Sequence, residues 1–311
     1  MSAPAVLAMA YGTPATMDDL ERYYTHIRRG HAPPPELLED LRDRYGAIGG
    51  RSPLLEITRA QAAGLEDALR RARHDDVRVV LGMKHAPPFI EDAARSLIAS
   101  GAARVVGLVL APHFSSMSIG EYAARAAAAL GIDEGGPDFE MVRSWATAPG
   151  YVAWLAEAVG AALTRLGPAS TDAEVVFTAH SLPVRILAAG DPYPDELRAT
   201  AEAVAAAAGL SRWSIAWQSA GRTKDPWIGP DVLEVLPGIA AAGASGVVVC
   251  PAGFVADHLE VLYDLDIEAA AAARELGLPF ARTASPNAAP ALAATLAAVV
   301  EPRLAPRVEL R

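Results

Sequence analysis

The stretch Glu174-Val175-Val176-Phe177-Thr178-Ala179-His180-Ser181-Leu182-Pro183 lies just past the middle of the sequence and decides our interpretation of the fold. A mostly apolar run is followed there by a histidine and then by a proline turn. Strands that are buried on both faces of a parallel sheet have such runs, and ligands bind outside their carboxyl ends. We therefore expect a strand over 174–179 with His180 at its functional end.

Similar apolar runs alternate with helical segments along the whole chain, which is typical of βαβ units. Two other predicted strands are followed by a histidine, His85 and His113. Each histidine alone is most simply a polar residue that closes a strand, whereas three together favour a site. The predicted fold class is α/β, with two Rossmann-like domains over 1–146 and 147–311. Each is a mostly parallel sheet flanked by helices, with an active-site cleft between them, and the last helix is a candidate to pack back on the first domain.

Composition narrows the class of protein. The 311 residues carry a net charge of −10, which argues against a nucleic-acid-binding surface. The first ten residues have no basic region followed by a long apolar core, and no apolar run approaches the ~20 residues of a membrane span. We expect a cytoplasmic protein without a membrane span. The single cysteine, Cys250, is expected to be a buried small hydrophobe, and it cannot supply a cluster of four thiolates.

A second notable stretch, 253–268, follows the apolar run that ends at Pro251. If this stretch is an α-helix, one face presents four carboxylates, which belong to Asp257, Glu260, Asp264 and Glu268. A solvated acidic face is the ordinary interpretation of such spacing. Its position after a buried strand favours a site instead, because imidazole and carboxylate groups together can hold a divalent ion such as Fe²⁺.

Motifs of several common enzyme classes are absent from the sequence: the zinc pair H-E-x-x-H, the phosphate loop, the G-x-G-x-x-G fingerprint and the G-x-S-x-G elbow. A site with histidine, carboxylates and a basic rim remains. The candidate rim lies in the first half and comprises Thr13, Arg28, Arg29, Arg44, Arg51, Ser52 and Lys84. Guanidinium and hydroxyl groups suit carboxylate recognition, although arginines on an ordinary surface are an equally good interpretation.

At these residues the sequence resembles the ferrochelatases, and most closely the coproporphyrin ferrochelatases of bacteria. The resemblance runs through nearly the whole chain. It is carried by segments 9–14, 23–30, 47–54, 111–115, 179–183, 191–194, 217–219 and 253–260. It weakens around 220–224, which puts any substrate contact there in doubt.

The resemblance implies insertion of Fe²⁺, as a substrate, into a porphyrin. The histidine of A-H-S-L-P and the glutamate of D-H-L-E, here His180 and Glu260, would face the porphyrin centre. Asp264 and Glu268 would lead the metal inward, and Tyr11 would ligate product iron. Contacts to the porphyrin are implied for Tyr11, Thr13, Arg28, Arg44, Ser52 and Tyr122, and we add Arg29 and Lys84 from the basic rim. No permanently bound cofactor and no [2Fe–2S] cluster are expected.

Elementary chemistry agrees with these roles. Two pyrrole protons must leave as Fe²⁺ arrives, so the site needs a base that is neutral near working pH, which histidine can provide. Coproporphyrin III carries four propionates, which the basic rim suits, and we expect it to be the substrate. Transient contact with a coproheme decarboxylase is a further implication of the resemblance. The alternatives are a chelatase for protoporphyrin IX, for another metal or for another tetrapyrrole, or a non-catalytic carrier on the same fold.

Overall fold

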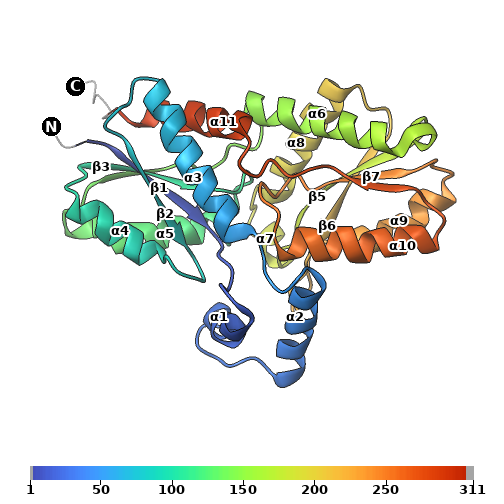
Figure 1. Ribbon diagram of the computed structural model, residues 1–311, viewed down its shortest axis with the longest axis horizontal. Helices are drawn as coiled ribbons and strands as arrows, with labels where there is room; N and C mark the ends of the chain where they lie inside the picture. Colours follow the sequence, from blue (N-terminus) through green and yellow to red (C-terminus); the bar gives the residue numbers. More distant parts are fainter. Residues whose placement is uncertain (1–2, 306–311) are drawn as a thin grey trace. The chain divides into compact units, whose positions relative to one another are not determined.

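A computed structural model describes residues 3–305 of the chain (Figure 1). Residues 1–2 and 306–311, the ends of the two predicted domain ranges, lie outside the described residues. The chain forms two compact units, and each is described by itself. Unit 1 comprises residues 1–111, 118–145 and 287–311, and unit 2 comprises residues 112–117 and 146–286.

Unit 1 is built on a four-stranded parallel sheet in the order β2-β1-β3-β4. Its strands are β1 (Ala5–Ala10), β2 (Arg78–Met83), β3 (Arg104–Val109) and β4 (Asp138–Met141). All six residues of the central strand β1 are buried, as are all six of β3. Continuous apolar runs therefore mark the strands that neighbouring elements cover on both faces.

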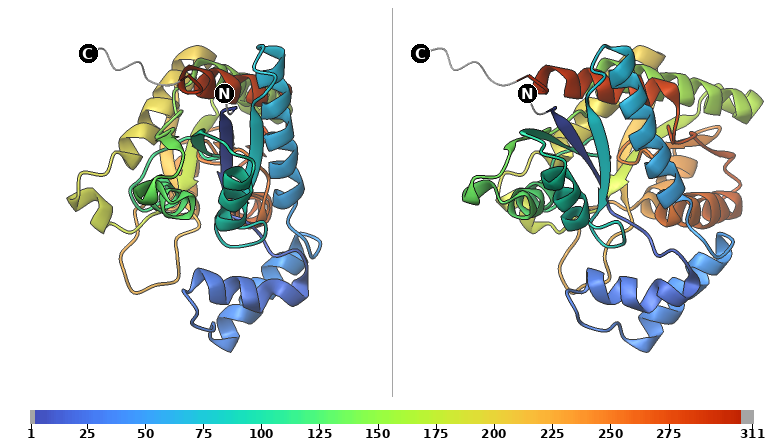
Figure 2. Two further views of the ribbon diagram at one scale, coloured as in Figure 1. Left: turned by 90° about the vertical axis from the view of Figure 1, so that its left-hand side faces the viewer. Right: turned by 60° about the vertical axis from the view of Figure 1, so that its left-hand side comes forward.

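Helices cover both faces of this sheet. Helices α3 (Leu54–Arg71) and α11 (Pro290–Val300) pack together, and α4 (Ile90–Ala99) packs with α5 (Ile119–Leu130) (Figure 2). The short helices α1 (Leu20–Ile27) and α2 (Pro35–Ala47) also pack on each other. The proline-rich segment 33–35 separates α1 from α2, because proline cannot continue a helix but suits its first turn.

Unit 2 repeats the design with the strand order β6-β5-β7-β8, again parallel throughout. Its strands are β5 (Glu174–His180), β6 (Trp213–Gln218), β7 (Val247–Cys250) and β8 (Phe280–Arg282). Helices α6 (Pro149–Leu166) and α8 (Tyr193–Ala208) pack together. Helices α9 (Val232–Ala241) and α10 (Ala270–Glu275) pack together as well (Figure 1). This unit also contains the 3-10 helix η3 (Gly167–Ser170), the single turn α7 (Arg185–Ala188) and a π-helix, η4 (Val261–Ala269).

Two segments distinguish these units from the domain ranges 1–146 and 147–311. Residues 112–117 belong to unit 2, where Asp191 Oδ2 accepts hydrogen bonds from Ser115 Oγ (3.1 Å) and from Ser116 N (2.7 Å). Residues 287–311 belong to unit 1, where α11 packs on α3. The contacts of a segment, and not its position along the sequence, decide to which unit it belongs.

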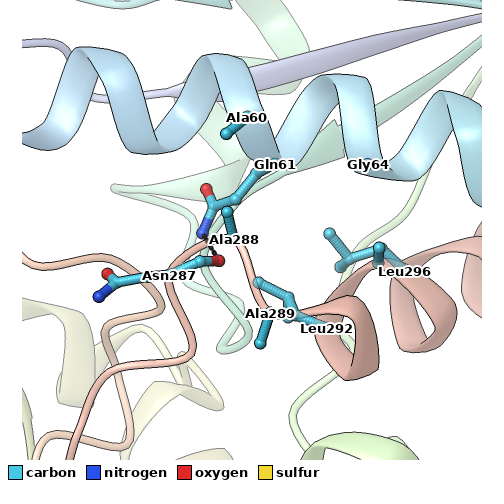
Figure 3. Close-up of a pocket in the computed structure, with 9 residues that line it drawn as sticks. Ala60, Gln61, Gly64, Asn287, Ala288, Ala289, Leu292 and Leu296 are labelled. Carbon is cyan, nitrogen blue, oxygen red and sulfur yellow. Dashed lines mark hydrogen bonds between the residues drawn. The ribbon is translucent and has the colours of Figure 1, made fainter.

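A small pocket lies between α3 and the start of α11 (Figure 3). Gln61 is its most polar feature on α3, and Gln61 Nε2 donates to the carbonyl oxygen of Asn287 at 2.9 Å. No titratable side chain lines this pocket. We regard it as a packing feature, in which the hydrogen bond from Gln61 holds the segment before α11 against α3.

Cys250 ends strand β7 and is fully buried, as expected. Burial raises the pKa of its thiol to about 12. Across residues 3–305 no helix is both long enough and apolar enough to cross a membrane.

Candidate active site

His180 is the last residue of β5, and several hydrogen bonds fix its backbone. Its carbonyl oxygen accepts a hydrogen bond from Tyr193 OH at 3.0 Å, and the next amide, Ser181 N, donates to Gln218 O at 2.7 Å. Tyr193 is itself held at the start of α8, where its amide donates to Asp191 Oδ1 at 3.1 Å. The imidazole therefore projects from a rigid strand end, as the sequence predicts.

Glu260 reaches the same strand end because the loop after β7 comes very close to β5. Gly253 N donates to Thr178 O at 3.0 Å, and a Cβ on Gly253 would lie 2.6 Å from the Cβ of Ala179. A side chain at position 253 would push the loop away, so glycine is required here. Farther along, Gln218 Nε2 lies 3.4 Å from the carbonyl oxygen of Glu260 and ties it to β6.

The carboxylate of Glu260 lies between two imidazoles. Its Oε1 is 3.6 Å from His180 Nε2, and its Oε2 is 3.3 Å from His258 Nε2. Each histidine has a carbonyl oxygen at its other nitrogen: Ser181 O is 2.5 Å from His180 Nδ1, and Ala256 O is 2.9 Å from His258 Nδ1. Because a carbonyl oxygen only accepts, both Nδ1 atoms carry hydrogen, and both Nε2 atoms face the carboxylate.

This arrangement perturbs the pKa of all three groups. Burial lowers the pKa of His180, but the charge of Glu260 and the hydrogen bond to it outweigh burial, so the pKa of His180 is raised. The pKa of His258 is raised because its bond to Glu260 likewise outweighs burial. Burial would raise the pKa of Glu260, yet the two imidazoles hold it well below its usual range. Such a cluster can pass a proton between nitrogen and oxygen, which is typical of catalytic sites. His180 and Glu260 each keep 33% of the side chain exposed, so a ligand can reach them.

Asp264 joins the cluster through a strained neighbour. Ser219, the residue after β6, has a φ of +60° and donates from Oγ to Asp264 Oδ2 at 2.5 Å. A serine in this left-handed region is uncommon, and such conformations occur often at functional sites. Asp264 is buried and adds to the raised pKa of His180.

The structure differs in two respects from the α-helix on which the face of four carboxylates depends. Residues Val261–Ala269 form a π-helix, with i→i+5 hydrogen bonding in place of the α-helical pattern. Asp257 precedes that helix and pairs with Arg282, with 3.2 Å between Asp257 Oδ1 and Arg282 Nη1. The carboxylates therefore do not form one row, because Glu260 and Asp264 lie near His180 whereas Asp257 is paired with Arg282.

Glu268 lies four residues beyond Asp264 on the same π-helix and is half-buried. Residues 3–305 contain no group of three or more His, Cys, Asp or Glu side chains arranged to hold a metal ion. The pair His180 and Glu260 offers an imidazole nitrogen and two carboxylate oxygens, which is a donor set that Fe²⁺ accepts.

In unit 1, Tyr11 follows the central strand β1 and is 43% exposed. Its ring lies 4.6 Å from the ring of His85, centre to centre, and His85 Nδ1 lies 3.1 Å from Nδ1 of His26. Burial, together with the charges of Lys84, His26 and Arg125, lowers the pKa of His85 to about 3. The imidazole of His85 is thus neutral at physiological pH.

Lys84 and Tyr122, both predicted to bind substrate, lie together beside Tyr11. Lys84 Nζ is 5.2 Å from the centre of the Tyr122 ring and 2.5 Å from Glu121 Oε2. Burial raises the pKa of Tyr122 well above its usual range, and the electrostatic interaction with Tyr11 adds to this effect. Tyr122 therefore keeps its hydroxyl proton and can donate a hydrogen bond.

The other predicted rim residues lie near α1, α2 and the start of α3. Thr13 Oγ1 and Tyr45 OH are 3.0 Å apart and buried, and the buried Ser52 accepts from Leu54 N at 3.3 Å. Arg44 Nε is 3.2 Å from Asp40 Oδ2. Arg29 is exposed with a φ of +56°, while Arg28 lies over the ring of Tyr24 and its buried Nε has no hydrogen-bond partner within residues 3–305.

Three residues of the site were missed by reasoning from the sequence: His258, Ser219 and Arg282. His258 could have been found, because it stands two residues before Glu260 in the same short motif. Ser219 and Arg282 carry no local signal. They come from the ends of β6 and β8, the two strands that flank β5 and β7 in the sheet.

Paired parallel sheets of this order define a chelatase-type fold. SirB from Bacillus subtilis, in a structure with Fe³⁺, is similar with a TM-score of 0.59 and 13% identity, over 97% of this chain and 96% of SirB. DR2241 from Deinococcus radiodurans, a multi-domain protein with structural similarity to chelatases, has a TM-score of 0.50 and 13% identity, over 96% of this chain and 55% of that one. At this identity the similarity shows the fold alone, and it confirms the predicted fold class.

Comparisons of the sequence show to which family the chain belongs. The family model for ferrochelatase matches residues 3–304, and the chain belongs to the ferrochelatase family. It is 46% identical to a coproporphyrin III ferrochelatase of Anoxybacillus flavithermus, over 95% of this chain and 94% of that protein. It is 45% identical to the coproporphyrin III ferrochelatase of Geobacillus kaustophilus, over 96% of both chains. The predictions of family and of a metal-insertion enzyme are confirmed.

Proposed function

We propose that this protein inserts Fe²⁺ into coproporphyrin III to give coproheme, a step of haem biosynthesis. The observation that carries the proposal is the cluster of His180, Glu260 and His258 at the end of β5, in a chain about 45% identical to proteins that bear this activity in their name. Family membership supports the class of reaction, and the cluster supplies the chemistry that the reaction needs.

His180 is the proposed acceptor of a pyrrole proton. Its Nδ1 is committed to the carbonyl oxygen of Ser181, so only Nε2 can take the proton from substrate. The raised pKa makes Nε2 more basic than that of an ordinary histidine. Because two pyrrole protons leave in each cycle, His180 and His258 must both first release their Nε2 protons to solvent, and the approach of a divalent cation favours that release by electrostatic repulsion.

Glu260 is the proposed route by which the proton leaves. Its carboxylate contacts His180 on one side and His258 on the other, so a proton can move from His180 Nε2 to Glu260 and on to His258 Nε2. The same oxygens can replace waters from the hydration shell of Fe²⁺. Asp264 and Glu268 continue from Glu260 along the π-helix, and we propose that they attract the ion before insertion.

Side chains of unit 1 are proposed to bind the substrate through its propionates and, for Tyr11, through iron in the product. Lys84, Arg28, Arg29 and Arg44 supply positive charge, and Thr13, Ser52 and Tyr122 supply hydroxyl groups. The buried Nε of Arg28 supports this assignment, because a buried guanidinium N–H without a partner in the described chain suits an anionic ligand. Four propionates need more such partners than two, which favours coproporphyrin III over protoporphyrin IX.

Several finer points stay predictions. A cytoplasmic location is expected because the sequence shows no signal peptide and no membrane span, and the single cysteine argues against a [2Fe–2S] cluster. The lack of a permanently bound cofactor and transient contact with a coproheme decarboxylase, which would consume the product, are expected from the family resemblance.

The test is anaerobic incubation of the purified protein with Fe²⁺ and either coproporphyrin III or protoporphyrin IX, followed by absorbance spectroscopy. We expect metallation of coproporphyrin III at the higher kcat/KM. A preference for protoporphyrin IX would overturn the substrate assignment. Porphyrin binding without metallation by Fe²⁺, Co²⁺ or Zn²⁺ would indicate a carrier and overturn the enzyme assignment.

A further inference from the structure

Arg282, the last residue of β8, binds two carboxylates at once. Its Nε and Nη2 lie 2.7 and 2.9 Å from the two carboxylate oxygens of Asp266, and its Nη1 lies 3.2 Å from Asp257 Oδ1. The remaining direction of Nη1 is used by the carbonyl oxygen of Thr283 at 3.0 Å. Only 13% of the side chain is exposed, and the two-pronged contact to Asp266 is one that a lysine cannot make.

In the sequence the two carboxylates stand on either side of Glu260 and Asp264. Asp257 comes three residues before Glu260, and Asp266 comes two residues after Asp264. Ser285 Oγ also donates to Asp257 Oδ1, at 2.8 Å. The end of β8 thus holds both ends of the short segment that carries Glu260 and Asp264.

This segment needs such an attachment because its own sequence does not favour a π-helix. The π-helix η4 contains neither proline nor glycine, and π-turns are rare unless tertiary contacts maintain them. If the segment relaxed to α-helical pairing, each shift of one residue would turn the following side chains by about 100°. Asp264 would then lose the hydrogen bond from Ser219.

Arg282 also separates the charges of the acidic stretch. Asp257 and Asp266 are both paired with the guanidinium, whereas Glu260 and Asp264 adjoin His180, His258 and Ser219. Without this cation, four carboxylates within ten residues would repel one another.

We propose that Arg282 is a positioning residue, which holds the π-helix Val261–Ala269 so that Glu260 and Asp264 keep their contacts to the histidines and to Ser219. Arg282 does not touch the reacting atoms and acts through Asp257 and Asp266. The kinetic part of this inference rests on the proposed function, and its structural part does not.

The experiment compares Arg282→Ala and Arg282→Lys with a matched control, Arg212→Lys. Arg212 also pairs with two carboxylates of unit 2, Asp172 and Glu174, but at the opposite end of β5. We expect Arg282→Ala to lower kcat for metal insertion about 10- to 100-fold, as is usual for residues that orient a metal site. The KM for coproporphyrin III should change less than about twofold. The kcat of Arg282→Lys should lie between those of Arg282→Ala and the unmodified protein. Added guanidinium ion should partly restore the kcat of Arg282→Ala. The kcat of Arg212→Lys should equal that of the unmodified protein.

Two readouts do not depend on activity. Amide hydrogen exchange over 261–269 should be at least about tenfold faster in Arg282→Ala, and binding of Zn²⁺ measured by calorimetry should weaken about tenfold. If Arg282→Ala does not fold, Asp266→Asn serves instead, because it breaks the fork and leaves the contact to Asp257. Unchanged kcat together with unchanged exchange over 261–269 would overturn the proposal. An unmodified protein without activity would overturn the proposed function, while exchange and Zn²⁺ binding would still test Arg282.

Discussion

The two sheets share one strand order and differ in the chemistry at their strand ends. In unit 1 the order is β2-β1-β3-β4, and in unit 2 it is β6-β5-β7-β8, so β1 and β5 hold corresponding central positions. Tyr11 follows β1, and His180 ends β5. The same topology thus presents a proposed site residue at the corresponding place in each unit, as expected for parallel sheets.

The neighbours of these positions give opposite protonation behaviour. His85, at the end of β2, lies among Lys84, His26 and Arg125, and its pKa is lowered to about 3. His180 lies beside Glu260, and its pKa is raised although burial opposes this. Strand order therefore decides where a side chain stands, and the charges around it decide which protonation state it prefers.

The largest expected effect is the loss of activity when His180 of unit 2 is replaced, and replacement of His85 of unit 1 provides the comparison. His180→Ala should lower kcat by about 10²- to 10⁴-fold, because it removes the proton acceptor. His85→Ala should lower kcat less than about tenfold, because a histidine with a lowered pKa is a weak base. Stopped-flow absorbance measures both. Coproporphyrin binding, followed by fluorescence, should persist in each variant, and a His180→Ala protein that turns over at near full rate would disprove the assigned base.

Removing the carboxylate beside His180 should lower the pKa of His180 and so bring its protonation behaviour closer to that of His85 in unit 1. Glu260→Gln should lower the plateau of kcat about 10- to 100-fold. The pKa of His180 is raised by Glu260, and the neutral imidazole is the proposed active form, so activity should rise with pH through that raised value. Without the charge, the acidic limb of the kcat profile should move to lower pH. If the acidic limb of the kcat profile has the same pH midpoint in Glu260→Gln, Glu260 does not set the pKa of His180.

A third histidine, His113, provides a buried reference without a carboxylate. Burial lowers its pKa from 6.5 to about 3, and its Nε2 lies 2.9 Å from Thr200 Oγ1. Between these pH values the unfolded chain binds a proton that the native state does not, so the free energy of unfolding falls as pH falls.

The slope from this one group should be about 1.4 kcal/mol per pH unit. Urea unfolding at pH 7, 6 and 5 measures it, and the control is His113→Gln, which keeps a hydrogen-bond donor but does not titrate. Equal slopes for both proteins would contradict the assignment.

The smallest effect is expected at the paired charges of unit 1. Lys84→Met removes a proposed propionate partner and should raise the KM for coproporphyrin III about three- to tenfold, with kcat nearly unchanged. Arg70→Met removes a positive charge from the exposed surface of the same unit, where Arg70 pairs with Glu66, and should change neither constant. Steady-state kinetics compare the two, and equal KM values would remove Lys84 from the substrate site.

Much of the architecture could be predicted because its signals are local. The apolar runs at β1, β3 and β5 and the histidine that ends β5 are readable along the chain, and parallel topology places such ends at one edge of a sheet. Family membership followed from motifs of consecutive residues, among them A-H-S-L-P and D-H-L-E. The conformation and pairing of the acidic stretch could not be predicted, because four carboxylates at helical spacing look alike whether a partner binds them or not.

What the sequence by itself determined is the α/β class, the ferrochelatase family and the pairing of a strand-end histidine with a carboxylate after the next strand but one. Tertiary structure alone decided that Val261–Ala269 is a π-helix, that His258 and Ser219 join the site, and that Arg282 binds Asp257 and Asp266. The physical reason is the range of the interactions. Burial patterns and turns act between near neighbours in the chain, whereas the conformation of a marginal helix and the pKa of a buried group depend on side chains that the sheet brings from distant positions.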